Sequence, residues 1–105
     1  MADDRVRVAS EQEIPPGQCL VVEVDAELTV ALANVDGRIY AVDNLCPHRG
    51  GPLGEGALKG GVLQCPWHGW QIDVATGGMV QNPAVKTACF PVVVDNGEVS
   101  IIRPA

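Results

Sequence analysis

The sequence predicts an all-β protein, and three observations support this prediction. Short apolar runs rich in valine and leucine recur along the chain, as β-strands prefer. Glycine pairs and Asp-Gly or Asn-Gly pairs separate these runs, which is typical of tight turns between antiparallel strands. Helix signals are scarce: Ser10 and Glu13 resemble a capping box, but Pro15 and Pro16 limit any helix there to about one turn. We therefore expect roughly eight to ten short strands.

The clearest predicted hairpin lies in the first half of the chain. Cys19–Val24 and Leu28–Val35 are apolar runs with the composition of strands. Asp36-Gly37 then separates the second run from a third, Arg38–Asp43. Because a two-residue Asp-Gly loop favours the turn that joins antiparallel strands, these runs should be neighbours in one sheet.

The second half repeats this plan. Residues 90–102 read as a hairpin with its turn at Asp95-Asn96-Gly97, and the pairs Gly60-Gly61 and Gly77-Gly78 mark two further reversals. Residues 44–56 and 65–70 are rich in glycine and proline and fit loops better than strand interiors. Such residues permit tight backbone paths around a bound group.

The chain has 105 residues, which we expect to form a single domain over residues 1–105. A net charge of −6 argues against nucleic acid as a partner, since phosphate binding requires a basic surface. The polar N-terminus does not resemble a signal peptide, and no apolar run approaches the ~20 residues that span a bilayer. We therefore expect a cytoplasmic protein, in which cysteines serve metal or redox chemistry rather than disulfides.

The chain has only two histidines, and each follows a Cys-Pro pair closely. Written as spacing, the motif is Cys46-x-His48, then sixteen residues, then Cys65-x-x-His68. Each half supplies one thiolate and one imidazole. Four ligands of this softness on two loops suit zinc or an iron–sulfur cluster.

The order of the ligands favours two metals over one. Zinc sites of the Cys2His2 kind usually keep the cysteines together and the histidines together on a helix. Here the two types alternate, so each loop can give its cysteine to one iron and its histidine to the other. This is the ligand pattern of a Rieske [2Fe–2S] centre. A zinc-stabilised interaction module stays an alternative.

The stretches CPHRG and CPWHGW resemble the two cluster loops of Rieske proteins. The resemblance covers most of the chain, including the preceding hairpin, the DVATG and QNPA segments and the last hairpin. It implies stacked antiparallel sheets with the cluster-binding loops at one tip, and one Rieske-type [2Fe–2S] cluster. It further implies that Cys46 and Cys65 bind the buried iron, and that His48 and His68 bind the more exposed iron.

The residues near the motif resemble the low-potential branch of this family. High-potential Rieske proteins link the two loops with a disulfide, but the matching positions here are Gly51 and Trp67. They also place hydroxyl donors near the cluster sulfurs, where this chain has Trp70 and Ile72. Because fewer donors stabilise the reduced cluster less, we expect a potential nearer roughly −150 mV than +300 mV.

Several other positions carry expectations of their own. Cys19 and Cys89 are expected to pack in the core as small hydrophobic residues. Trp67 and Trp70 flank His68 and should pack so that they shield the cluster, with a place in a docking surface as the alternative for Trp67. Residues 83–84, Pro-Ala, resemble the proline loop that covers the cluster in this family.

The resemblance implies a Rieske-type ferredoxin, an electron carrier rather than an enzyme. It would take one electron from an NAD(P)H-dependent flavoprotein reductase and pass it to a terminal oxygenase, as a monomer that docks transiently. An oxygenase needs a catalytic iron bound by two more histidines and a carboxylate, and this chain has no further histidine. A small electron-transfer subunit of a nitrite reductase-like complex is the other redox alternative.

Overall fold

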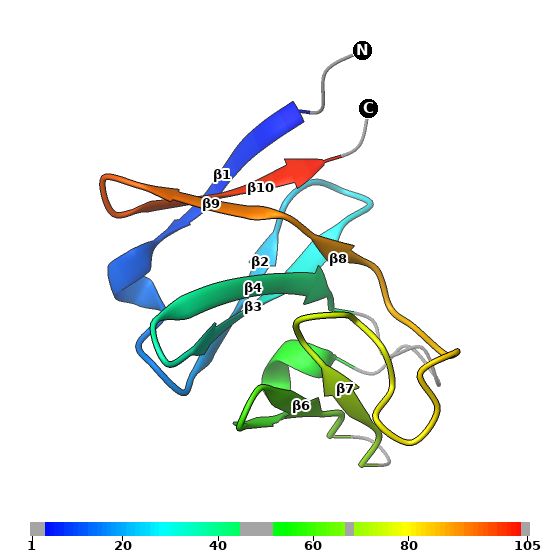
Figure 1. Cartoon of the computed structure of the whole chain (residues 1–105). Coiled ribbons are helices and arrows are strands. Elements are labelled where there is room, and N and C mark those ends of the chain that lie inside the picture. Colours follow the sequence, from blue (N-terminus) through cyan, green and yellow to red (C-terminus); the bar gives the residue numbers. More distant parts are fainter. Residues whose placement is uncertain (1–3, 45–51, 67–68, 104–105) are drawn as a thin grey trace.

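The computed structural model describes residues 4–44, 52–66 and 69–103 (Figure 1). Within these ranges the chain forms strands and two short 3-10 helices, so the all-β prediction is confirmed. In chain order the elements are β1 (Asp4–Ser10), η1 (Glu11–Glu13), β2 (Cys19–Glu23), β3 (Thr29–Val35), β4 (Arg38–Asp43), η2 (Leu53–Glu55), β5 (Ala57–Lys59), β6 (Val62–Gln64), β7 (Gln71–Asp73), β8 (Cys89–Phe90), β9 (Val92–Asp95) and β10 (Glu98–Arg103).

The strands form antiparallel sheets that stack in three layers (Figure 1). One sheet has the order β1-β10-β9, the second β2-β3-β4-β8 and the third β5-β6-β7. The four-stranded sheet lies between the other two, with apolar side chains buried on both of its faces. The predicted arrangement of stacked antiparallel sheets is therefore confirmed.

The predicted hairpin turns form where the sequence places them. Asp36-Gly37 joins β3 to β4 with φ values of 53° and 95°, and Asn96-Gly97 joins β9 to β10 with 53° and 78°. Two successive residues with positive φ are the mark of a type I′ turn, whose twist matches that of the strands it joins. Gly60-Gly61 makes the same reversal between β5 and β6, with φ values of 58° and 82°.

The structure divides the strand expected after residue 90 into two. Cys89 and Phe90 form β8, which pairs with β4, whereas β9 begins at Val92 and pairs with β10 in another sheet. Pro91 lies between them and has no N–H to donate to a ladder. Its carbonyl accepts the Ile102 N–H at 2.9 Å, so the chain changes sheets at the proline.

The first strand was not expected, because the N-terminus reads as polar and charged. Val6 and Val8 alternate with Arg5 and Arg7, and the valines pack against the core while the arginines stay exposed. This period of two is the signature of an edge strand with one buried face. β1 pairs antiparallel with β10, which places the two ends of the described chain side by side (Figure 1).

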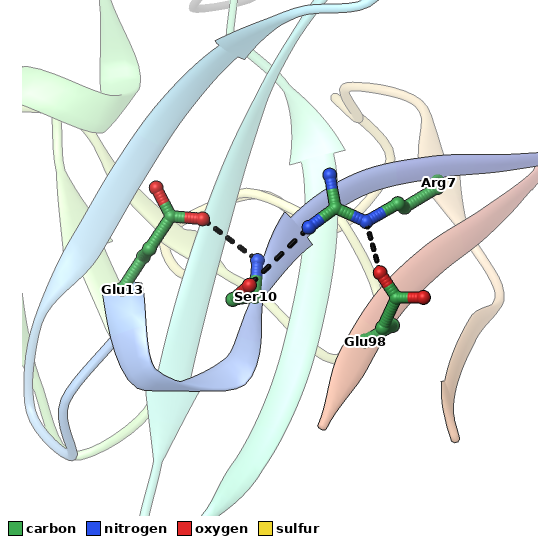
Figure 2. Close-up of polar contacts among 4 residues, drawn as sticks. All are labelled: Arg7, Ser10, Glu13 and Glu98. Atoms are coloured by element: carbon green, nitrogen blue, oxygen red, sulfur yellow. Dashed lines mark hydrogen bonds and ion pairs between the residues drawn. The ribbon is translucent and has the colours of Figure 1, made fainter. Parts of the chain in front are cut away.

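The end of β1 is held by the polar contacts that Figure 2 shows. The Ser10 N–H donates to the Glu13 carboxylate at 2.7 Å, so the predicted capping interaction begins η1. The Arg7 guanidinium donates to Glu98 on β10 and to the Ser10 hydroxyl, the latter at 3.2 Å. These exposed contacts fasten β1 to β10 where the chain turns away from the sheet.

Two apolar cores lie on opposite faces of the sheet β2-β3-β4-β8. Successive side chains of a strand point to opposite faces, so β3 contributes to both cores. The core shared with β1 and β10, called the base core, contains Ala9, Ile14, Val30, Leu32, Ile39, Ala41, Val99 and Ile101. The core shared with η2, β6 and β7, called the ligand-side core, contains Ala31, Ala33, Val42, Leu53, Leu63, Cys65, Ile72 and Val74.

Candidate metal centre

The second predicted ligand loop joins β6 to β7. Gln64 and Gln71 are paired across the hairpin, and the Cys65 N–H donates to the Trp70 carbonyl at 2.7 Å. The Gly69 N–H donates back to the Cys65 carbonyl at 3.0 Å. Gly69 adopts a φ of 75°, a conformation that glycine reaches without strain, and this lets the loop close tightly. The backbone at both ends of this loop is therefore fixed.

Cys65 is buried, with 3% of its surface exposed, and belongs to the ligand-side core. It packs in the same cluster as Leu53, which follows the first predicted ligand loop, and Ile72, which follows the second. The structure thus brings the flanks of both loops together around one of the four predicted ligands. His68 and Trp67 lie outside the described residues.

The first predicted ligand loop, residues 45–51, lies outside the described residues, and with it lie Cys46 and His48. The structure describes both of its flanks. Asn44 precedes the loop and Leu53 follows it, and the Leu53 N–H donates to the Asn44 carbonyl at 2.8 Å. The two flanks are therefore within hydrogen-bond distance of each other.

Trp70 and Ile72, the residues at the positions where the resemblance implies hydroxyl donors, both contact the cluster of apolar residues that contains Cys65. Ile72 is fully buried in the ligand-side core, and the half-buried Trp70 packs against that core. Ile72 presents only methyl and methylene groups there, and the indole of Trp70 carries no hydroxyl. The low redox potential expected from these residues stays a prediction.

The two other cysteines differ from each other. Cys19 is half-buried and packs against the ligand-side core, and burial raises the pKa of its thiol above the ordinary value of 9.0. Cys89 is exposed, and its Sγ lies 3.6 Å from the Thr76 carbonyl oxygen. The prediction that Cys89 packs in the core was wrong, because its neighbour Phe90 packs against the base core and Cys89 therefore points to the opposite face of β8, where it is exposed.

The segment expected to be the proline loop forms a tight turn after β7. The Met79 N–H donates to the Val85 carbonyl at 2.8 Å, and the Val85 N–H donates to the Asn82 carbonyl at 2.9 Å. Pro83 and Ala84 are exposed at the tip of this turn. The Val80 N–H donates to the carbonyl of Gln71 at 2.8 Å, which holds the base of the turn beside β7. That this turn covers a cluster stays a prediction.

The sequence analysis missed Asn44 as a structural part of the site. Its side chain accepts a hydrogen bond from the Gly54 N–H at 2.7 Å, across the first ligand loop. An asparagine between a strand and a glycine-rich stretch is a signal that could have pointed to it, since asparagine side chains often bond to nearby backbone groups.

None of the helices among the described residues is long and apolar enough to cross a membrane.

Comparisons with known proteins agree with this geometry. The profile of the Rieske [2Fe–2S] domain family matches residues 4–94. The ferredoxin component of the naphthalene 1,2-dioxygenase/salicylate 5-hydroxylase systems of a Ralstonia species is 34% identical over 102 residues, which cover 96% of this chain and 97% of the relative.

Two solved structures show the likeness in three dimensions. One is a chain from a complex of reduced oxygenase and oxidised ferredoxin in carbazole 1,9a-dioxygenase, with a TM-score of 0.87, 30% identity, and coverage of 96% of this chain and 95% of that chain. The other is described as the small subunit of an NADH-dependent nitrite reductase from Mycobacterium tuberculosis. Its TM-score is 0.89 at 23% identity, with coverage of 100% and 99%, a likeness that shows the fold alone.

Proposed function

The chain belongs to the Rieske [2Fe–2S] domain family, and from this premise we propose that it carries single electrons from a flavoprotein reductase to a terminal oxygenase. The observation that carries the proposal is the match, over nearly the whole of both chains, to proteins named as ferredoxin components of dioxygenase systems. These relatives are electron carriers of multicomponent systems rather than catalytic enzymes. The cofactor of the family is one Rieske-type [2Fe–2S] cluster.

The proposed ligands are Cys46 and Cys65 for one iron and His48 and His68 for the other. Two thiolates and two imidazoles, one of each from each loop, are the donor set of such a cluster. Cys65, the member of this set that the structure describes, is almost fully buried among apolar side chains. This burial suits the thiolate-bound iron on the inner side of the cluster, so the residues present fit the group.

When bound, the cluster takes up and gives back one electron. The protein's own residues provide the surroundings of this exchange. Leu63 and Ile72 exclude water from the inner side at Cys65, and Trp70 packs along the same core. Both ends of the second loop are fixed by backbone hydrogen bonds, so Cys65 needs little rearrangement when the charge changes.

The proposed partners are an oxygenase that receives the electron and an NAD(P)H-dependent flavoprotein reductase that supplies it. In the carbazole 1,9a-dioxygenase structure a ferredoxin forms a complex with its oxygenase, which supports the first partner. Since a carrier must leave each partner, we expect a monomer with small, transient contacts. A net charge of −6 would steer it toward basic surfaces in the cytoplasm.

Visible and EPR spectra of anaerobically purified protein, before and after dithionite, test the cofactor and its redox activity. We expect a coloured protein that bleaches on reduction and acquires the EPR signal of a reduced [2Fe–2S] centre with mixed ligands. Cys65→Ala should abolish the colour and the signal, whereas Cys89→Ala, at an exposed cysteine, should keep both. A colourless protein with one zinc per chain would contradict the proposal and favour the zinc module.

Size-exclusion chromatography of native extracts tests the carrier role. A free carrier should elute at the mass of its own chain. Stable co-elution with a large subunit would instead favour the small subunit of a nitrite reductase-like complex. Rapid reoxidation of the reduced protein by an oxygenase, measured by stopped flow, would support the proposed direction of electron transfer.

A further inference from the structure

The two flanks of the first ligand loop are joined by a pair of hydrogen bonds at one residue. The carbonyl of Asn44 accepts the Leu53 N–H at 2.8 Å, and its side-chain Oδ1 accepts the Gly54 N–H at 2.7 Å. Asn44 precedes Cys46 by two residues in the sequence, and η2 begins at Leu53. The two ends of the segment that carries Cys46 and His48 are thus held together at Asn44.

Asn44 is itself held by the sheet. Its N–H donates to the Thr29 carbonyl on β3 at 2.9 Å, and only 8% of its surface is exposed. The Asn44 side chain satisfies one backbone group, the Gly54 N–H, and a buried side chain in this role is costly to replace because its removal leaves that N–H without this partner. The hydrogen bonds therefore connect η2, through Asn44, to the beginning of β3 in the central sheet.

The glycines of η2 and its end leave little room for displacement. A Cβ added to Gly54 would overlap Val21 Cγ2 and lie 2.9 Å from Asn44 Oδ1. A Cβ added to Gly56 would overlap the carbonyl oxygen of Gln64, the residue before Cys65. One short helix is thus fitted between the flank of the first ligand loop and the flank of the second.

We propose that Asn44 is a positioning residue for the cluster, which holds η2 and thereby sets the separation of the two ligand loops. The inference rests on the proposed function, since it concerns the ligands assigned there. Partners behind metal ligands orient those ligands, and their loss commonly costs about 10–100-fold in metal affinity. Asn44 acts here through the backbone of Leu53 and Gly54, which follow the loop, in contrast to a partner that bonds to a ligand side chain.

The chain offers a matched control at the other end of β3. Asn34 is 4% exposed, its Oδ1 accepts the Gly37 N–H at 2.7 Å, and its Nδ2 donates to the Ile14 carbonyl at 2.7 Å. It is therefore a second buried asparagine that holds a glycine N–H, but it lies beside the β3–β4 turn. Asn34→Ala should lower stability without touching either ligand loop.

The experiment compares Asn44→Ala, Asn44→Asp and Asn34→Ala with the parent protein. We measure iron per chain, the chelator concentration that removes half of the iron, the EPR g values of the reduced state and the thermal midpoint. Asn44→Ala should need about tenfold less chelator and should shift the g values. Asn44→Asp keeps an oxygen that accepts the Gly54 N–H and should restore both readouts. Asn34→Ala should lower the thermal midpoint alone.

A second variant decides the matter if Asn44→Ala does not fold. Val21→Ala removes the methyl that a Cβ on Gly54 would overlap, and Val21 is 38% exposed, so the change alone should be tolerated. When Gly54→Ala is added to this variant, the new Cβ lies 2.9 Å from Asn44 Oδ1, which is then its closest contact. The double variant should shift the g values and the chelator sensitivity relative to Val21→Ala.

The outcomes separate the failure of this inference from the failure of the proposed function. If Asn44→Ala or the double variant loses only thermal stability, as Asn34→Ala does, the positioning role is wrong while the electron carrier stands. If the parent protein binds no cluster, the proposed function fails and the positioning role fails with it. Shifted g values and easier iron loss, absent in Asn34→Ala, support the role.

Discussion

The two faces of the sheet β2-β3-β4-β8 are covered in different ways. β1 and β10, of seven and six residues, cover the base core and pair along their length. The ligand-side core is covered by η2 and by β5, β6 and β7, which have three residues each. Strands this short form few ladder hydrogen bonds and are marginal alone. The ligand-side layer therefore depends more on close packing and on its bound group.

The side chains of β3 show the same division. Val30 and Leu32 point into the base core, whereas Ala31 and Ala33 point to the ligand side. The large side chains fill the space between two sheets. The small ones let η2 approach, since a Cβ on Gly54 would lie 3.3 Å from the Ala31 Cβ. The base core thus supplies stability by burying large apolar side chains. The small residues on the ligand side let η2 pack close to β3.

The largest expected effect follows removal of the cluster by a chelator. Binding of a metal group is also folding free energy for the segments that hold it. The amides of Leu63 and Ile72 should lose hydrogen-exchange protection toward an opening free energy of about zero, as in a mobile loop. Those of Val99 and Ile101 should stay protected. Equal loss in both layers would show that the two cores unfold as one unit.

The second-largest effect is expected from a cavity in the base core. Ile101 is fully buried, so Ile101→Ala should lower the free energy of unfolding by about 2–5 kcal/mol, measured by urea denaturation. The visible spectrum and iron content of the folded protein should match the parent. Val94→Ala, at a side chain 42% exposed, serves as the control and should cost about 0.5 kcal/mol or less. A changed spectrum in Ile101→Ala would mean that the cores are coupled.

Overpacking at Gly56 should disturb the other layer. Gly56→Ala should cost about 1–3 kcal/mol, because the backbone near Gln64 must move, and iron per chain should fall. Gly78→Ala is the matched control, since its Cβ would meet the Thr76 hydroxyl at 3.3 Å, a contact that only a small shift of that side chain relieves. Iron analysis and thermal unfolding of both variants provide the measurement. Full iron content in Gly56→Ala would contradict the inference that Gly56 must pack closely against the Gln64 carbonyl for the protein to hold its iron.

The smallest effect concerns the Cys19 thiol. Burial raises its pKa, so the folded state holds this proton at pH values where the unfolded chain has lost it. The stability from this group is complete below pH 9.0 and is lost as the pH rises above that value. Cys19→Ala should therefore flatten the decline of the thermal midpoint above pH 9.0, and Cys89→Ala should not. An unchanged decline in Cys19→Ala would refute the assignment to this thiol.

The turns were the most predictable features of the sequence. Asp36-Gly37, Asn96-Gly97 and Gly60-Gly61 form the expected reversals, because a left-handed backbone at two adjacent positions depends on those residues themselves. The exposure of Cys89 was not predictable, since an apolar segment gives no sign of which face of its strand the rest of the protein covers. The hydrogen bond between the Asn44 side chain and the Gly54 N–H was not predicted, because the two residues lie ten positions apart on either side of the first ligand loop.

The sequence by itself determined that the chain is all β, where most strands reverse, and that two short stretches each carry one cysteine and one histidine, which we propose as ligands. These properties follow from residue types and spacings within short windows. Only the tertiary structure decided that β3 is buried on both faces, that Pro91 transfers the chain from one sheet to another, and that η2 fits between Asn44 and Gln64. These properties depend on contacts between distant segments, which form only when the three layers pack together.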